Sequence, residues 1–249
     1  MSAPLYFRVV RRLRRWRRRL VAFATGVPPT GRAELGDLRR TAPLCDSFGF
    51  SRGTPVDRVY IDAFLARHAA DIRGRVLEVK EPAYATRFGA GRVECIDVVD
   101  IDPANPRATV VADLAEAPQL ADDAYDAVVL TQTLQLIYRH EAALATVHRV
   151  LKPGGVLLIT VPGVTTVGAA EGVDASWCWS YTQLSLARML EERFGAGAFE
   201  VASHGNVLAA IAFLEGLAAE ELTAGELAVH DPDYPLVVVG RAVKRAAAR

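Results

Sequence analysis

Acidic and amide side chains stand at or beside the ends of four predicted strands. Glu78 lies in a Val-Leu-Glu-Val run, Asp97 ends the next apolar run, and Asp113 follows the third. Thr131 and Gln132 follow the fourth. Ligands of parallel α/β sheets bind outside the carboxyl ends of the strands, so these groups are expected to line one crevice. Spaced acids in an otherwise apolar slot suit the ribose hydroxyls and adenine amine of an adenosyl group.

The elements that must position these side chains alternate between strand and helix. Strands are predicted over 75–79, 93–97, 109–112, 125–130, 155–161, 199–203 and 236–243, and helices over 55–65, 141–151, 183–194 and 206–217. Near-continuous apolar strands separated by helices are typical of a parallel sheet covered on both faces. Pro82 leaves little room for a helix in the first crossover, and Pro103 and Pro106 disfavour one in the second.

Several short sequence motifs occur in an order and spacing that match a known family. They are Val-Leu-Glu-Val79, Asp97, Ala-Asp-Leu114, Tyr-Asp-Ala-Val-Val-Leu130 and Arg-Val-Leu-Lys-Pro-Gly-Gly-Val-Leu-Leu-Ile-Thr-Val-Pro162. The run over 76–163 resembles the core of the class I S-adenosylmethionine-dependent methyltransferases. This resemblance implies a Rossmann-like α/β fold: a seven-stranded, mostly parallel sheet with an antiparallel edge strand and helices on both faces.

The same resemblance implies S-adenosyl-L-methionine as cofactor and gives roles to the strand-end residues. The acid after the second strand holds the ribose in that family, which implies Asp97. The acid after the third strand lies beside adenine, which implies Asp113 with Leu114. If the second strand continues further than we expect, Asp100 or Asp102 takes the place of Asp97.

The turn after the first strand departs from the family pattern. The family normally has glycines there, whereas this chain reads Lys-Glu-Pro-Ala-Tyr-Ala-Thr-Arg-Phe before its first glycine, Gly89. We therefore expect Lys80, Glu81 and Tyr84 to contact the cofactor, with Lys80 pairing its carboxylate and Glu81 its ammonium group. The alternative is a pocket that this turn partly closes.

Candidate catalytic groups are few. Related small-molecule enzymes often place a histidine after the fourth strand, where this chain has Gln135. His140 and His204 are the remaining candidates for a base. The alternative for His140 is an exposed position at the start of the next helix, and the alternative for His204 is a bridge to the helix that follows it.

Aromatic residues after the fifth strand suggest an acceptor surface. Trp177, Trp179 and Tyr181 present ring faces that suit sugars or planar acceptors, unless they form a lid packed on the core. Arg58, in the helix before the first strand, is a further substrate candidate unless it forms an ordinary ion pair on the helix surface.

A second resemblance narrows the acceptor. The phrases over 48–62, 130–138 and 205–210 are similar to bacterial methyltransferase-like proteins associated with glycosyltransferases, which often share the glycine-poor turn. This implies O-methylation of a sugar, a glycan or a secondary metabolite. The alternatives are a non-catalytic binding partner of a glycosyltransferase and a non-methylating enzyme on the same fold. The absence of Gly-x-Gly-x-x-Gly disfavours a nicotinamide dehydrogenase.

Charge divides the chain into two regions. Residues 1–40 carry 11 basic and 2 acidic side chains, and the rest carries 18 basic and 27 acidic ones. We therefore predict an N-terminal extension and linker over 1–40 and a methyltransferase-like domain over 41–249. Residues 8–23 form a basic amphipathic pattern that suits an anionic membrane surface or a glycosyltransferase partner, or else a solvated extension.

The cysteines and the apolar runs indicate in which cellular compartment the protein is expected. Cys45, Cys95 and Cys178 are widely spaced and odd in number, so we expect neither a disulfide framework nor a structural metal. No apolar run reaches the roughly 20 residues of a membrane span. We predict a cytoplasmic protein, with peripheral attachment at the inner membrane surface through residues 8–23 as the variant, and no nucleic-acid partner.

Overall fold

The computed structural model describes residues 26–167 and 177–246. Its contacts divide the chain into two units, Met1–Ala42 and Pro43–Arg249. The described part of the first unit contains a short 3₁₀ helix, Gly36–Arg39. The basic amphipathic helix predicted over residues 8–23 lies outside the described residues.

The second unit is built from alternating strands and helices. Its strands are β1 (Gly74–Val79), β2 (Val93–Asp100), β3 (Val110–Val111), β4 (Tyr125–Thr131), β5 (Leu151–Pro162), β6 (Phe199–His204) and β7 (Val237–Val243). Its α-helices are α2 (Val56–Arg67), α3 (Ala83–Gly89), α4 (His140–Val150), α5 (Gln183–Phe194), α6 (Val207–Leu214) and α7 (Ala224–Ala228). Short 3₁₀ turns lie at Ala69–Asp71, Leu134–Leu136 and Ala219–Glu221.

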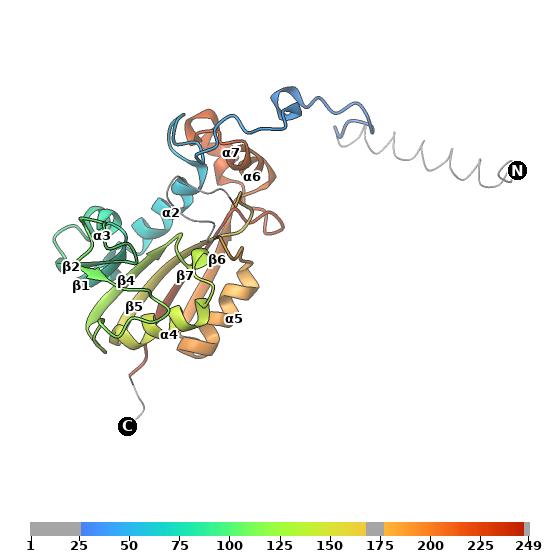
Figure 1. Ribbon diagram of the computed structural model, residues 1–249. Coiled ribbons are helices and arrows are strands. Elements are labelled where there is room, and N and C mark those ends of the chain that lie inside the picture. The colour runs from blue at the N-terminus through green and yellow to red at the C-terminus, as the bar shows by residue number, and fades with distance from the viewer. Residues whose placement is uncertain (1–25, 168–176, 247–249) are drawn as a thin grey trace, which may run out of the picture. The chain divides into compact units, whose positions relative to one another are not determined.

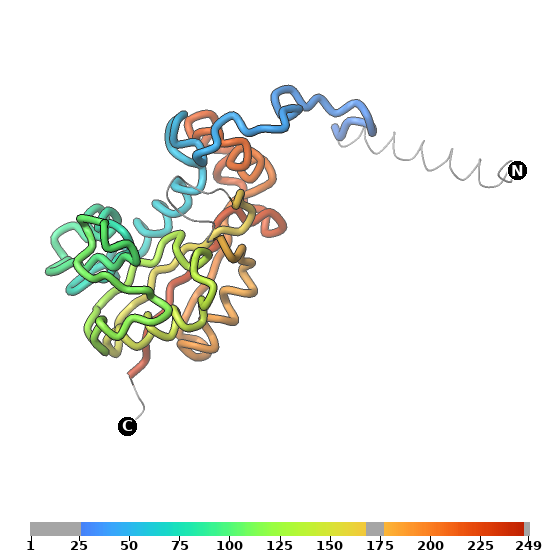
Figure 2. The backbone as a smooth tube through the Cα atoms, in the orientation of Figure 1, coloured from blue at the N-terminus to red at the C-terminus, as the bar shows by residue number. Residues whose placement is uncertain are grey.

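The strands form a single seven-stranded sheet in the order β3-β2-β1-β4-β5-β7-β6 (Figure 1). All neighbouring strands are parallel except at β7, which runs antiparallel to both β5 and β6. The chain runs outward from β1 to β3 and then returns to β4, as the tube in Figure 2 traces. This confirms the predicted Rossmann-like fold, and it places the reversal of strand order between β1 and β4.

Side chains alternate between two cores, one on each face of the sheet. Leu77 belongs to the core that α4 and α5 cover, with Leu144 and Leu186. Val76, its neighbour in β1, belongs to the core that α2 and α6 cover, with Ile61. Figure 1 shows α4 and α5 side by side along the sheet. Both faces of β1 are therefore buried, which explains the continuous apolar runs in the sequence.

The second strand is longer than the sequence pattern suggested. It continues past the predicted end at Asp97 to Asp100, because Val98 and Val99 are buried and pair with Glu78 and Val79 of β1. The third strand is shorter than predicted and spans only Val110–Val111. The first crossover contains the seven-residue α3, and no helix lies between β2 and β3 in the described chain, as the prolines predicted.

The largest of the other boundary differences are at the start of β5 and the end of α6. The fifth strand begins at Leu151 instead of residue 155, with a register shift opposite Tyr125 and with Gly154 at φ +82°. Helix α6 ends at Leu214 rather than residue 217, because Gly216 turns the chain at φ +70°. A Cβ on Gly216 would lie 2.0 Å from the carbonyl oxygen of Cys45, so only glycine fits there.

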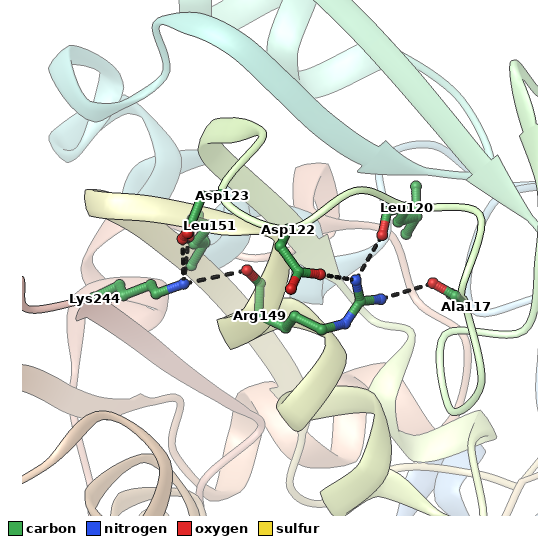
Figure 3. Close-up of polar contacts among 7 residues, drawn as sticks. All are labelled: Ala117, Leu120, Asp122, Asp123, Arg149, Leu151 and Lys244. Atoms are coloured by element: carbon green, nitrogen blue, oxygen red, sulfur yellow. Dashed lines mark hydrogen bonds and ion pairs between the residues drawn. The ribbon is translucent and has the colours of Figure 1, made fainter. Parts of the chain in front are cut away.

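Arg149 and Lys244 tie the end of α4 to the segment before β4 (Figure 3). The Arg149 guanidinium donates to the carbonyl oxygens of Ala117 at 2.7 Å and Leu120 at 2.6 Å, and to the carboxylate of Asp122 at 2.5 Å. Lys244 donates to the carbonyl oxygens of Arg149 and Leu151 and to the Asp123 carboxylate. The arginine of the Arg-Val-Leu-Lys-Pro-Gly-Gly phrase therefore has a structural role.

Candidate functional site

The carboxyl ends of β1 and β4 meet at the reversal of strand order, and both lead into strained backbone. Lys80 has φ +69° directly after β1, and Gln132 has φ +45° directly after β4. The Lys80 N–H donates to the Val99 carbonyl and the Gln132 N–H to the Thr160 carbonyl, at 3.0 and 2.9 Å. Positive φ is costly for residues with a Cβ, and such strain clusters at ligand sites. The turn after β1 thus enters the left-handed conformation without a glycine.

A pair of substitutions tests this strain. Lys80→Gly should be more stable to unfolding than Lys80→Ala by about 1 kcal/mol, because glycine adopts positive φ without a Cβ clash. Chemical denaturation of both variants measures the difference. Glu81, which has no positive φ, provides the matched pair, and there the alanine variant should be at least as stable. Equal stability of the two Lys80 variants would argue against strain at this turn.

Glu78 binds the first residues of α3, which follow the turn after β1. Its side chain is buried, and the backbone N–H groups of Tyr84 and Ala85 donate to its two carboxylate oxygens at 2.9 and 2.8 Å. Burial raises the pKa of Glu78 to about 7. Each Glu78 oxygen thus accepts one N–H at the start of α3, which gives the side chain a capping role there, and its predicted contact with the cofactor stays a prediction.

Asp97 does not end its strand. It lies three residues before the end of β2, where its carboxylate accepts from Arg75 Nε at 2.8 Å and from the Tyr125 hydroxyl at 3.0 Å. These bonds hold it within the sheet framework, so its predicted place at the strand end is wrong. The longer β2 is the physical reason, and it favours the alternative, Asp100.

Asp100 is the acid at the carboxyl end of β2. One carboxylate oxygen accepts from Asn105 Nδ2 at 2.6 Å, and the other accepts from the Asp102 N–H at 3.1 Å. Each oxygen keeps a lone pair for a further donor. Ile101 follows with its side chain 69% exposed, an apolar surface next to a carboxylate. The sequence pattern missed Ile101 because an isolated exposed isoleucine carries no signal.

A surface hollow of about 500 Å³ lies at this edge of the sheet. Its lining includes Lys80, Glu81, Asp100, Asp102, Asn105 and Arg107. Asn105 Nδ2 also donates to the Lys80 carbonyl at 2.8 Å, which ties the loop after β2 to the turn after β1. Glu81 forms an ion pair with Arg107, so its carboxylate already has a cationic partner. The structure thus brings the predicted Lys80, Glu81 and Asp102 together around Asp100.

The other strand-end residues lie along the same edge. Asp113 is exposed and accepts from the Ala115 N–H at 2.8 Å, and Leu114 is buried in the core. The Thr131 carbonyl accepts from the Thr133 hydroxyl at 2.9 Å. No contact among these residues tests their predicted cofactor roles, which stay predictions.

Helix α2 brings a second polar group to the turn after β1. Arg58 Nη1 donates to the Tyr84 hydroxyl at 3.1 Å, so a predicted substrate residue and a predicted cofactor residue meet. Asp57 is buried, and its Oδ1 has no hydrogen-bond partner among the described residues. Burial raises the pKa of Asp57, opposed by the charge of Arg58. The Phe50 ring lies 5.9 Å from the Arg58 guanidinium carbon.

Tyr138, His140, Trp179 and Tyr181 form an aromatic cluster after β4. The ring centroids of His140 and Trp179 are 4.5 Å apart, and Tyr138 stacks on Trp179 at 5.8 Å. The Gln135 side chain is buried, and its backbone carbonyl accepts from the N–H of Trp179 at 3.2 Å. This bond joins the segment that contains Trp179 to the segment that follows β4. Tyr138 is 75% exposed, so the aromatic cluster reaches the surface.

Trp177 and His204 lie apart from this cluster. Trp177 stacks on Phe48 at 6.3 Å, and Phe48 in turn packs on a phenylalanine of α6. His204 ends β6 and stacks on Tyr60 at 5.9 Å, with β5 and β7 between its strand and β4. Burial lowers the pKa of His204, and nearby His230 acts in the same direction. The His204 ring is therefore packed against another ring in the structure.

Neither metal-binding clusters nor membrane-spanning helices stand out in the described segments. Among residues 26–167 and 177–246, no three His, Cys, Asp or Glu side chains are grouped so that they could hold a metal ion. Within the same ranges, no helix is both long enough and apolar enough to cross a membrane.

Comparison with known proteins places this arrangement in context. Residues 82–159 match a family model described as a methyltransferase domain. A SAM-dependent methyltransferase from Archaeoglobus fulgidus has a similar structure, with a TM-score of 0.50 at 16% identity over 75% of this chain and 94% of that one. The Burkholderia thailandensis 1,6-didemethyltoxoflavin-N1-methyltransferase gives 0.45 at 16% identity over 76% and 81%. No curated protein matches the sequence.

Proposed function

We propose that this chain transfers the methyl group of S-adenosylmethionine to a small-molecule acceptor. The match of residues 82–159 to a methyltransferase domain and the similarity in fold to a SAM-dependent methyltransferase support this proposal. The observation that carries this proposal is the carboxyl edge of β1, β2 and β4. There, Asp100 and the strained turn at Lys80 border one hollow. Gln132, directly after β4, is a second residue with strained backbone at this edge. Strained, polar strand ends at a reversal of strand order are typical of a ligand site.

The residues at this edge fit the adenosyl part of the cofactor. The free lone pairs of Asp100 suit the ribose hydroxyls, and exposed Ile101 offers an apolar face for the adenine ring. Asp113 and Leu114 are proposed to lie beside adenine, as the sequence resemblance implies. A carboxylate that accepts two ribose hydroxyls forms charge-assisted hydrogen bonds, which are stronger than neutral ones.

The methionine part of the cofactor requires partners for a carboxylate and an ammonium group. Lys80 and Arg58 are candidate partners for the carboxylate, and Arg58 already donates to Tyr84 in the turn. Buried Asp57 is a candidate for the ammonium group beside Glu81: its Oδ1 accepts no hydrogen bond among the described residues and lies 4.0 Å from Arg58 Nε, whereas Glu81 forms an ion pair with Arg107. Side chains would then bind the methionine part of the cofactor, which the backbone of a glycine-rich turn binds in other proteins with this fold.

The acceptor is proposed to bind at the aromatic cluster and to be a sugar, a glycan or a secondary metabolite methylated on oxygen. The exposed Tyr138 ring and Trp179 supply flat apolar faces of the kind that pack against sugar rings. When bound, the cofactor supplies an activated methyl group, so the protein contributes mainly alignment and removal of a proton.

Calorimetric titration with S-adenosylmethionine and with S-adenosylhomocysteine tests this function. We expect both to bind, and methyl-labelled cofactor should then transfer its label to a hydroxylated sugar or metabolite acceptor. Failure of both ligands to bind at about 1 mM would refute the proposal, since that limit corresponds to less than about 4 kcal/mol of binding. It would favour the alternative of a non-catalytic glycosyltransferase partner.

Residues 8–23 are proposed to attach the protein to an anionic membrane surface or to a glycosyltransferase. Deletion of residues 1–30 should leave cofactor affinity unchanged while reducing sedimentation with anionic vesicles. Each Lys or Arg near such a surface contributes about 1 kcal/mol to membrane binding, so the deletion should reduce vesicle binding strongly at low salt. Equal sedimentation of the deletion variant and the full chain would exclude the membrane role.

A further inference from the structure

His140 and Tyr181 form a hydrogen-bonded pair within the aromatic cluster. His140 Nδ1 lies 3.1 Å from the Tyr181 hydroxyl oxygen, and that hydroxyl donates to the Leu134 carbonyl at 3.2 Å. Tyr181 is 4% exposed and His140 is partly buried at the first position of α4. The pair links the segment after β5 to the segment after β4.

The direction of these hydrogen bonds determines where the imidazole carries its proton. A carbonyl oxygen can only accept, so the single hydroxyl proton of Tyr181 is directed to Leu134. The Tyr181 oxygen must then accept from His140, which requires a proton on Nδ1. A neutral imidazole with its proton on Nδ1 has a bare lone pair on Nε2. Burial keeps the pKa of His140 below its ordinary value, opposed by Glu141, which favours the neutral ring.

Packing holds the ring in this orientation. Trp179 lies against the imidazole at a centroid distance of 4.5 Å, and the Trp179 indole N–H donates to the Tyr138 carbonyl at 3.3 Å. No hydrogen-bond partner for Nε2 lies within the described residues. The nitrogen with the lone pair is therefore the one that remains available to a ligand at the aromatic cluster.

We propose that Tyr181 is a positioning residue that holds His140 in the Nδ1–H tautomer, and that His140 Nε2 accepts the proton of the acceptor hydroxyl. This inference rests on the proposed function. In the step, the O–H bond breaks and the proton adds to Nε2. The electron pair left on the acceptor oxygen forms the bond to the methyl carbon, while the methyl–sulfur bond breaks and its electron pair stays on sulfur, which leaves as the neutral thioether. The resulting imidazolium then releases a proton to water.

Nitrogen-15 NMR of histidine-labelled protein tests the tautomer without any substrate or cofactor. The chain has five histidines, so the signal that disappears in His140→Gln identifies His140. We expect a protonated Nδ1 and a bare Nε2 in the unmodified protein. In Tyr181→Phe, which keeps the ring but removes the acceptor, the proton should move to Nε2. Tyr138→Phe is the matched control, because Tyr138 stacks on Trp179, and it should leave the His140 tautomer unchanged.

Kinetics test the role of the pair once an acceptor is known. His140→Gln should lower kcat by roughly 100-fold or more, the usual contribution of a general base, with little change in cofactor Kd. Tyr181→Phe should lower kcat in part while KM stays nearly constant.

A proton found on Nε2 in the unmodified protein, or an unchanged tautomer in Tyr181→Phe, would overturn the inference. Full kcat in His140→Gln would do the same. If the tautomer behaves as expected but neither cofactor ligand binds, the proposed function fails on its own while the Tyr181–His140 relation stands.

Discussion

Asp100→Ala should weaken S-adenosylmethionine binding by roughly 5- to 150-fold, which corresponds to the loss of about 1–3 kcal/mol in charge-assisted hydrogen bonds. Asp100 ends β2 at the lining of the hollow, and each of its oxygens has one protein donor and one free lone pair. Isothermal titration calorimetry of the variant and the unmodified protein measures the effect.

Two controls separate the carboxylate from its surroundings. Asp97→Asn removes the charge that accepts from Arg75 and Tyr125, so it should reduce stability but leave the cofactor Kd within about twofold, a few tenths of a kcal/mol. Asn105→Ala removes the donor that ties Asp100 to Lys80, and should weaken binding less than Asp100→Ala does. The opposite ranking, with Asp97 as the sensitive position, would return the ribose role to Asp97.

Arg149→Met should lower the free energy of unfolding by about 2–4 kcal/mol, because hydrogen bonds to a charged donor are strong and the Leu120 carbonyl would lose its donor, while the Ala117 carbonyl keeps the Leu120 N–H. The guanidinium satisfies the carbonyls of Ala117 and Leu120, two residues of the buried core. Methionine keeps most of the side-chain length but donates nothing. Thermal unfolding should shift down by about 5–12 °C in a chain of this size.

An exposed arginine of the same region provides the comparison. Arg139 forms an ion pair with Glu116 at 3.1 Å, and both side chains are largely exposed. Arg139→Met should therefore cost less than about 1 kcal/mol. Similar losses for the two variants would mean that the carbonyl contacts of Arg149 contribute little, and that packing around α4 stabilises this edge.

The fold could be predicted closely because burial leaves a direct trace in the sequence. Strands buried on both faces must be apolar throughout, so β1, β4 and β5 were recognisable from composition alone. Prolines between β2 and β3 excluded a normal helix for an equally local reason, the missing N–H and the fixed φ. The end of β2 was misplaced because the stretch from Asp97 to Asp100 mixes acids with valines, and only pairing with β1 shows that it continues.

The site was predicted less completely because it depends on distant contacts. That the turn after β1 lacks glycine is a sequence fact. That Lys80 nonetheless adopts a left-handed φ is decided by its hydrogen bond to Val99 in β2. In the same way, His140 was recognisable as a candidate base, but its tautomer depends on Tyr181, which lies 41 positions away in the sequence.

The sequence by itself therefore determined the sheet, its longer helices and the chemical types available at the strand ends, but not the short helices α3 and α7. The tertiary structure decided which acid stands at the end of β2, which carboxylates are already occupied, and which histidine nitrogen carries the proton. The physical reason is range: strand and helix patterns follow from side chains a few positions apart, whereas hydrogen-bond partners at the carboxyl edge come from separate segments that meet only when the sheet has formed.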